Sequence, residues 1–195
     1  MITNTFIHSF HSLIDPPNKK ELLDAVENAK LHDNQSFSWG DECILQQERL
    51  DFTGTDILGP SLNIFFNDIN ANLDGQLNLN IAEIWKNTYT KGSFQEIHDH
   101  NPHQLSGVIF LDDYKPGHGR FYFHNRHDSD FSREWREICL GRSRFHIDGK
   151  RGEVLLFPSY MLHGVSPQTI ESPRRTISFN ILFNIQPSTV SRNTK

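Results

Sequence analysis

The sequence predicts a mainly β fold with helices at its N-terminal end, arranged as an antiparallel sandwich or barrel. Two observations lead to this prediction. The hydrophobic period changes from that of a helix to that of a strand at Leu77, and short alternating segments then continue to Phe183. Glycine and proline separate these segments at short intervals, as turns do between antiparallel strands.

The 195 residues are expected to form a single domain, with about residues 1–76 as helical support and about residues 77–185 as the β core. A helix is predicted over about residues 18–32, where two prolines and the capping residue Asn18 precede a helical sequence. A second helix is predicted at residues 62–73, where apolar side chains recur at helical spacing. We expect both helices to brace the sheet.

Seven strands are predicted in the second half of the chain. Their ranges are 77–85, 105–111, 119–125, 144–148, 152–157, 161–165 and 175–183. The segment 124–144 is too long for a hairpin turn and is expected to contain a short helix. It has two interpretations, as a lid over a substrate or as an insertion without a role.

The composition of the chain argues against several classes of function and location. A net charge of −5 provides no global basic field for a nucleic acid or an anionic membrane. No apolar run approaches the roughly 20 residues that span a bilayer, and the N-terminus lacks the features of a signal peptide. Cys43 and Cys139 fit no metal or redox spacing, which indicates a reducing compartment. We therefore expect a cytoplasmic protein, for which a homodimer is one compatible state.

Three histidines form the main candidate site. His98 and His100, in the stretch HDH, would share one face of a strand and could grip one ion together. His163, in a short strand after a proline-containing turn, is the candidate for the third ligand. The chain has 11 histidines, so the alternative is a solvated loop and an ordinary core histidine. The combined spacing of these residues favours the metal site.

The motifs around these histidines resemble the 2-oxoglutarate/Fe(II)-dependent oxygenase superfamily, in particular a little-characterised bacterial and phage branch with a His-x-His motif. The resemblance covers roughly residues 80–185 and includes Gly92, HDH, SGVIFL, GEVLLFPSYMLHGV and RRTISFN in that order. It implies a double-stranded β-helix, which is a jelly-roll or cupin-like fold. It also implies an oxidoreductase, a dioxygenase that uses Fe(II), 2-oxoglutarate and O2 to hydroxylate an unidentified small-molecule or protein substrate.

The resemblance places the metal ligands at His98, His100 and His163. In this superfamily a basic residue about a dozen positions after the last ligand pairs with the distal carboxylate of 2-oxoglutarate, and Arg174 and Arg175 both lie there. The alternation of the strand favours Arg174, because its face is polar. The choice reverses if that polar face is simply solvated.

Three more residues are candidates for contacts to 2-oxoglutarate. Thr176 lies on the same strand face as Arg174 and could add a hydroxyl donor. Asn87 and Tyr89 lie on the strand that leads to the metal site.

One departure from the superfamily keeps two alternatives open. Most members have a carboxylate where this chain has His100, and three neutral imidazoles raise the demand of the ion for anionic ligands. The same spacing also resembles the two cupin motifs, although Gln104 stands in place of their glutamate. The first alternative is therefore a three-histidine cupin-type dioxygenase that does not use 2-oxoglutarate. The second is a non-catalytic jelly-roll binding module.

Overall fold

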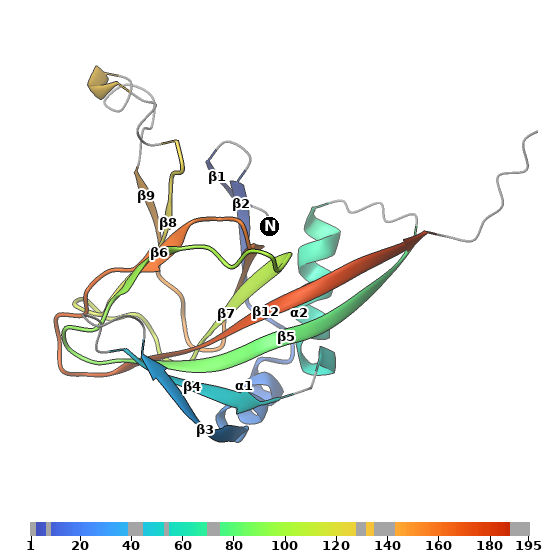
Figure 1. Cartoon of the computed structure of the whole chain (residues 1–195), viewed down its shortest axis with the longest axis horizontal. Helices are drawn as coiled ribbons and strands as arrows, with labels where there is room; N and C mark the ends of the chain where they lie inside the picture. Colours follow the sequence, from blue (N-terminus) through green and yellow to red (C-terminus); the bar gives the residue numbers. More distant parts are fainter. Residues whose placement is uncertain are drawn as a thin grey trace, which may run out of the picture.

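Two antiparallel sheets make up most of the computed structural model (Figure 1). The structure describes residues 3–6, 9–38, 45–52, 55–69, 75–127, 132–134 and 143–187. Neighbouring strands in both sheets are mostly far apart in the sequence, as in a jelly-roll. The predicted mainly β fold, a double-stranded β-helix, is therefore confirmed.

The large sheet has eight strands. In spatial order they are β1 (Thr3–Phe6), β2 (Ser9–Ile14), β10 (Val154–Pro158), β7 (Leu105–Phe110), β12 (Arg174–Pro187), β5 (Gly75–Tyr89), β4 (Gln46–Asp51) and β3 (Lys30–Ser38). The small sheet has four strands. In spatial order they are β6 (Gln95–His98), β11 (His163–Val165), β8 (Phe121–His124) and β9 (Arg144–Ile147).

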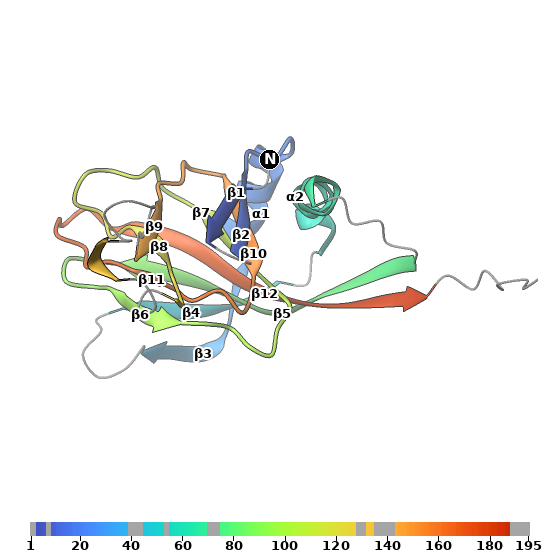
Figure 2. The same ribbon diagram turned by 90° about the horizontal axis from the view of Figure 1, so that it is seen from above.

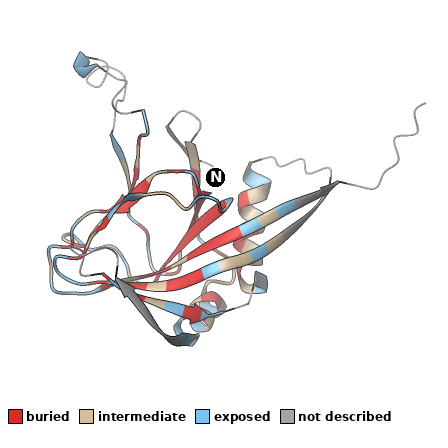
Figure 3. Cartoon of the chain, in the orientation of Figure 1, coloured by how far each residue is buried: buried red, intermediate tan, exposed pale blue. Residues whose placement is uncertain are grey.

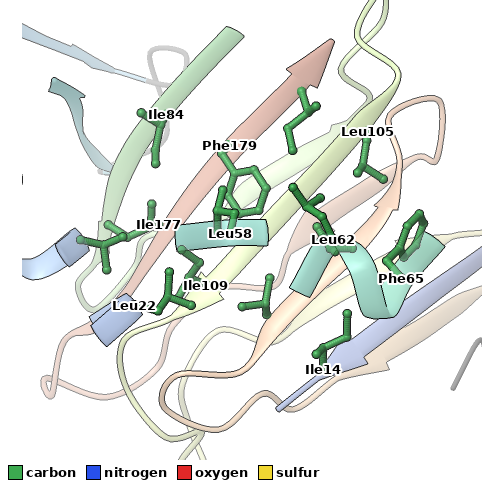
Figure 4. Close-up of a cluster of buried hydrophobic side chains, with 14 of the residues drawn as sticks. Ile14, Leu22, Leu58, Leu62, Phe65, Ile84, Leu105, Ile109, Ile177 and Phe179 are labelled. Carbon is green, nitrogen blue, oxygen red and sulfur yellow. The ribbon is translucent and has the colours of Figure 1, made fainter. Parts of the chain in front are cut away.

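Two helices cover one face of the large sheet, as expected from their apolar spacing. Helix α1 (Lys19–Glu27) and helix α2 (Thr55–Asp68) lie on the same side of the long β5–β12 pair (Figure 2). Leu58, Leu62 and Phe65 of α2 pack with Ile109, Ile177 and Phe179 of the sheet (Figure 4). Burial of these side chains is the main source of stability on this face.

The boundaries of both helices differ from the prediction. Helix α1 ends at Glu27, where Asn28 forms the C-cap through its backbone N–H to the carbonyl of Asp24, and the chain enters β3 at Lys30. Helix α2 begins at Thr55 and ends at Asp68, while residues 70–74 lie outside the described residues. The predicted helix was therefore correct in type but placed too late in the chain.

The first 76 residues are not only helical support, which corrects the sequence-based description of this region. Strand β2 pairs with β10, with Leu13 opposite Leu155, and β4 pairs with β5. Both pairings join segments far apart in the sequence, so local patterns do not reveal them. The N-terminal third thus completes the sheet that carries the candidate site.

A second core fills the space between the two sheets. It contains Phe110 of the large sheet, Phe121 and Phe123 of the small sheet, and Phe157 from the end of β10. Buried residues gather along β7, toward the end of β5 and in the first half of β12 (Figure 3). The candidate site lies at the edge of this aromatic core.

Two further expectations from the sequence concern the segment 124–144 and membrane-spanning segments. The short helix expected in the segment 124–144 falls largely on residues 128–131 and 135–142, which lie outside the described residues. Among the described residues, no helix has the length and apolar character needed to cross a membrane.

Candidate metal centre

Three histidines from two strands and one loop converge between the sheets. His98 ends β6, His163 begins β11, and the two are paired opposite each other in the small sheet. One nitrogen from each of His98, His100 and His163 lies within 4.8 Å of the other two. The structure therefore brings together the three histidines that the sequence selected.

The route by which His100 reaches the cluster differs from the prediction. Strand β6 ends at His98, so His100 lies beyond the strand rather than on its alternating face. Its backbone N–H donates to the carbonyl oxygen of Ser159 at 3.0 Å, and its carbonyl accepts from the backbone N–H of His103 at 3.0 Å. These bonds hold the turn that directs the His100 ring back toward His98.

Backbone carbonyls orient two of the three rings. Nδ1 of His98 lies 2.7 Å from the carbonyl oxygen of Glu96, and Nδ1 of His163 lies 2.8 Å from that of Met161. A carbonyl only accepts hydrogen bonds, so each Nδ1 carries the proton and each Nε2 carries the lone pair that an ion would bind.

Burial keeps all three imidazoles neutral. It lowers the pKa of His98, lowers that of His163 well below its ordinary value, and lowers that of His100 to about 3, with His98 adding to the effect on His100. Neutral imidazole is the form that binds iron, zinc and copper. The donor set and its protonation therefore fit a transition-metal ion.

Aromatic rings enclose the cluster on several sides. The ring of Phe121 stacks on His163 at 5.4 Å between centroids, and the ring of Phe157 makes a T-shaped contact with the same histidine at 4.9 Å between centroids. Trp85 of β5 lies 5.6 Å from His100. These side chains exclude water from the inner side of the cluster.

Arg174 is a buried cation at the far end of the same pocket. Its side chain is 3% exposed, and among the described residues its Nη1 finds no hydrogen-bond partner. Its guanidinium carbon lies 5.2 Å from the centroid of Tyr89 and 5.6 Å from that of Phe110. Burial lowers its pKa, so the charged form lacks adequate solvation. An anionic group beside Nη1 would relieve this cost.

Arg175 faces the opposite side of β12. Its guanidinium forms a two-pronged ion pair with Asp112, with Nε 3.0 Å from Oδ2 and Nη2 2.7 Å from Oδ1. Its charge is therefore already paired with a carboxylate, whereas none of the described carboxylates forms an ion pair with Arg174.

The other predicted contact residues divide into two groups. Thr176 and Tyr89 line the same pocket as the histidines and Arg174. The Tyr89 hydroxyl donates to Gln95 Oε1 at 2.7 Å. Asn87 is fully buried, and its amide bonds Gln47, Thr176 and Ser178. The structure therefore places Asn87 behind Thr176 as a support rather than on the pocket wall.

Sequence reasoning missed a chain of buried side-chain hydrogen bonds that ends at His100. Ser159 Oγ lies 2.8 Å from Ser106 Oγ, which donates to Asn180 Oδ1 at 2.8 Å, and Asn180 Nδ2 lies 3.2 Å from Nδ1 of His100. The three residues belong to the stretches FPSY, LSGV and SFNI, so the motifs were recognised without the role of their polar members.

Two cavities of different size adjoin the histidines. The space between the cluster and Arg174 is about 10 Å³, which is room for roughly one water molecule. A cavity of about 420 Å³ adjoins it, lined by β4 and the middle of β5, and shares Trp85 and His100 with the smaller space. The larger volume is typical of a small-molecule site.

Comparison with known proteins gives one family match in sequence. The family model described as "Putative 2OG-Fe(II) oxygenase" matches residues 83–180, a range that includes the three histidines and Arg174. No curated protein matches the chain.

Several solved structures share the fold at low sequence identity. An oxidoreductase of the 2OG-Fe(II) oxygenase family from Burkholderia pseudomallei has a TM-score of 0.55 at 16% identity, over 84% of this chain and 77% of its own. HygX from Streptomyces hygroscopicus, with nickel, 2-oxoglutarate and hygromycin B bound, has a TM-score of 0.53 at 14% identity, over 88% and 82%. The viral collagen prolyl hydroxylase of Paramecium Bursaria Chlorella virus-1, in its 2-oxoglutarate complex, has a TM-score of 0.53 at 13% identity, over 88% and 94%. At these identities the likeness establishes the fold alone.

Proposed function

Since this chain belongs to the 2OG-Fe(II) oxygenase family, we propose that His98, His100 and His163 hold its iron and that Arg174 and Thr176 hold its 2-oxoglutarate. The family is Fe(II)- and 2-oxoglutarate-dependent, so the chain is an oxidoreductase of the dioxygenase type. The observation that carries the residue assignment is the placement of three neutral imidazoles and one unmatched buried guanidinium in a single pocket.

The residues fit both groups chemically. Three imidazole nitrogens leave positions open on a six-coordinate ion, and they contribute no negative charge. The ion therefore favours an anionic ligand such as the 2-oxo acid end of 2-oxoglutarate. Arg174 Nη1 and the Thr176 hydroxyl supply donors for the other carboxylate. Because the space between them is about 10 Å³, side chains must move to admit the cosubstrate.

Bound Fe(II), with 2-oxoglutarate and O2, supplies the oxidising power for hydroxylation of a substrate C–H bond, with succinate and CO2 as coproducts. The chain supplies orientation and a dry environment. Phe121 and Phe157 shield the inner side of the histidines, and Tyr89 and Phe110 shield the Arg174 guanidinium. A substrate would therefore approach the histidines from the outer side, which these rings leave uncovered.

The cavity of about 420 Å³ is the proposed substrate site. Trp85 and His100 line both this cavity and the histidine pocket, so a substrate there reaches the metal centre. Its wall carries Arg49, Asp51 and Glu83 together with apolar side chains. It accepts either a small molecule or a side chain of a protein substrate. We also propose a cytoplasmic location, supported by the two widely separated cysteines.

The test is an anaerobic titration of the metal-free protein with Fe(II) and then with 2-oxoglutarate, followed by visible absorption of the chelate. We expect a band only when both are present, and no band in His163→Ala. His146→Ala is the matched control, since this half-buried histidine lies outside the cluster. Iron binding without a band would indicate the three-histidine cupin chemistry. No metal binding would indicate a non-catalytic module.

A further inference from the structure

The group that faces Nδ1 of His100 differs in kind from the groups that face Nδ1 of the other two histidines. His98 and His163 each face a backbone carbonyl, which can only accept a hydrogen bond. His100 faces the side-chain amide of Asn180, which has a donor end and an acceptor end. A half-turn of that amide exchanges the two ends.

In the structure the amide presents its donor end to His100. Asn180 Nδ2 lies 3.2 Å from His100 Nδ1 and 3.3 Å from Oε2 of Glu83. Its Oδ1 accepts from Ser106 at 2.8 Å. Because His100 Nδ1 accepts in this arrangement, the neutral ring carries its proton on Nε2, the wrong tautomer for an ion at that nitrogen.

We propose that Asn180 is a positioning residue whose amide selects the tautomer of His100, and that Glu83 holds this amide in the orientation that opposes metal binding. When an ion binds Nε2, that nitrogen releases its proton to solvent and Nδ1 takes one from solvent, so no proton is gained or lost. Nδ1–H then needs an acceptor, which the half-turned Asn180 provides through Oδ1. This inference rests on the proposed role of His100 as a ligand.

The neighbours of Asn180 are able to follow this turn. After it, Nδ2 would donate to Ser106 Oγ, and the Ser106 hydroxyl would turn toward Ser159 Oγ, which lies 2.8 Å away. Glu83 would lose its bond from Nδ2. Its other oxygen already lies 3.7 Å from Nη2 of Arg49, and its side chain is 42% exposed, so it is free to move toward that arginine.

This arrangement links the metal centre to the larger cavity. Glu83 and Arg49 both line the cavity of about 420 Å³. In the orientation of the structure Glu83 is shared between Asn180 and Arg49, and after the half-turn of Asn180 it would be released to Arg49 alone. Metal loading therefore changes the charge distribution on the wall of the proposed substrate site.

Two substitutions test the proposal with opposite expected effects on zinc(II) affinity, with zinc as a diamagnetic substitute for iron. Asn180→Leu removes the acceptor, and we expect zinc affinity to fall about 10- to 100-fold. Glu83→Gln removes the group that opposes the turn, and we expect affinity to rise several-fold. Simple electrostatics predicts the reverse for Glu83→Gln, because a negative charge near the cation is lost. Asn87→Leu is the matched control, since this buried amide of the same sheet bonds no histidine.

Nitrogen-15 spectra of the histidine rings give a readout that a merely structural role would not change. We expect the His100 proton to be on Nε2 without zinc and on Nδ1 with zinc. The protons of His98 and His163 should be on Nδ1 both before and after zinc is added. A His100 proton on Nδ1 in both states would overturn the proposal, as would unchanged zinc affinity in Asn180→Leu. Failure of the wild-type protein to bind zinc would instead overturn the ligand assignment under the proposed function.

Discussion

Arg174 on β12 lies directly opposite Tyr89 on β5, and its guanidinium carbon is 5.2 Å from the centre of that ring. The ring face offers the buried cation a weak attraction but no hydrogen-bond acceptor for Nη1. The adjacent Arg175 is paired with Asp112 on the other side of the sheet. Two consecutive arginines on one strand thus differ in whether their charge is matched.

This difference predicts opposite outcomes for the same substitution at the two positions. Arg174→Gln should lower the affinity for 2-oxoglutarate at least about 100-fold, because the charge-assisted hydrogen bond from Nη1 to the distal carboxylate is lost, and should leave Fe(II) affinity unchanged. Arg175→Gln should leave both affinities unchanged. Anaerobic calorimetric titration measures both constants. Equal loss of 2-oxoglutarate binding in the two variants would contradict the assignment.

Metal binding should stabilise the folded protein. The ion binds the assembled three-histidine site and not the unfolded chain, so a free concentration 100 times the dissociation constant should add about 2.7 kcal/mol to the free energy of unfolding. Thermal unfolding with and without zinc(II) measures this increase. His163→Ala should abolish it, and His146→Ala should preserve it. An equal shift in both variants would place the stabilising ion elsewhere.

Gly107 is expected to tolerate no larger residue. A Cβ atom at this position of β7 would overlap the ring of Phe179, which is 1% exposed and held between the sheet and the helices. Gly107→Ala should therefore lower the free energy of unfolding by about 1–3 kcal/mol. Urea denaturation provides the measurement. Gly59→Ala in α2 is the control, because a Cβ there meets nothing within 4 Å and alanine favours the helix.

His11 should make the protein less stable in mild acid. Burial against Phe123 and Phe145 lowers its pKa from 6.5 to about 4. Between these values the unfolded state binds the proton and the folded state does not, so stability is complete above pH 6.5 and falls as the pH drops toward 4. The loss from this residue is at most about 3 kcal/mol. Unfolding free energies across that range should fall less steeply for His11→Phe than for the wild-type protein.

Local sequence patterns were sufficient to predict which way side chains point where all residues on one face of an element are apolar or all are polar. The alternation in β12 separates Ile177, Phe179 and Ile181, which pack against the helices, from Arg174 and Thr176, which line the pocket. Histidine spacing likewise selected the three histidines that the fold brings together. In both cases the prediction needs only the types of residue that recur at a fixed spacing.

Features that depend on contacts between segments far apart in the sequence could not be predicted from local patterns. The stretch SFHSLI at 9–14 is a strand because it pairs with β10, and nothing within it requires that partner. The position of His100 depends on a bond to the backbone of Ser159. The role of Asn180 depends on its distance to Ser106 and His100, which no sequence separation encodes. Polar residues that act through one another were therefore the least predictable part of the site.

The pairing of His98 with His163 across the small sheet has a consequence for synthesis of the protein. A ribosome releases the HDH stretch well before the segment that forms β11. Until then the nascent chain offers an ion only two of its three nitrogens, and the rings are not yet shielded by Phe157. A complete three-nitrogen site therefore forms only after β11 has been synthesised and has paired with β6.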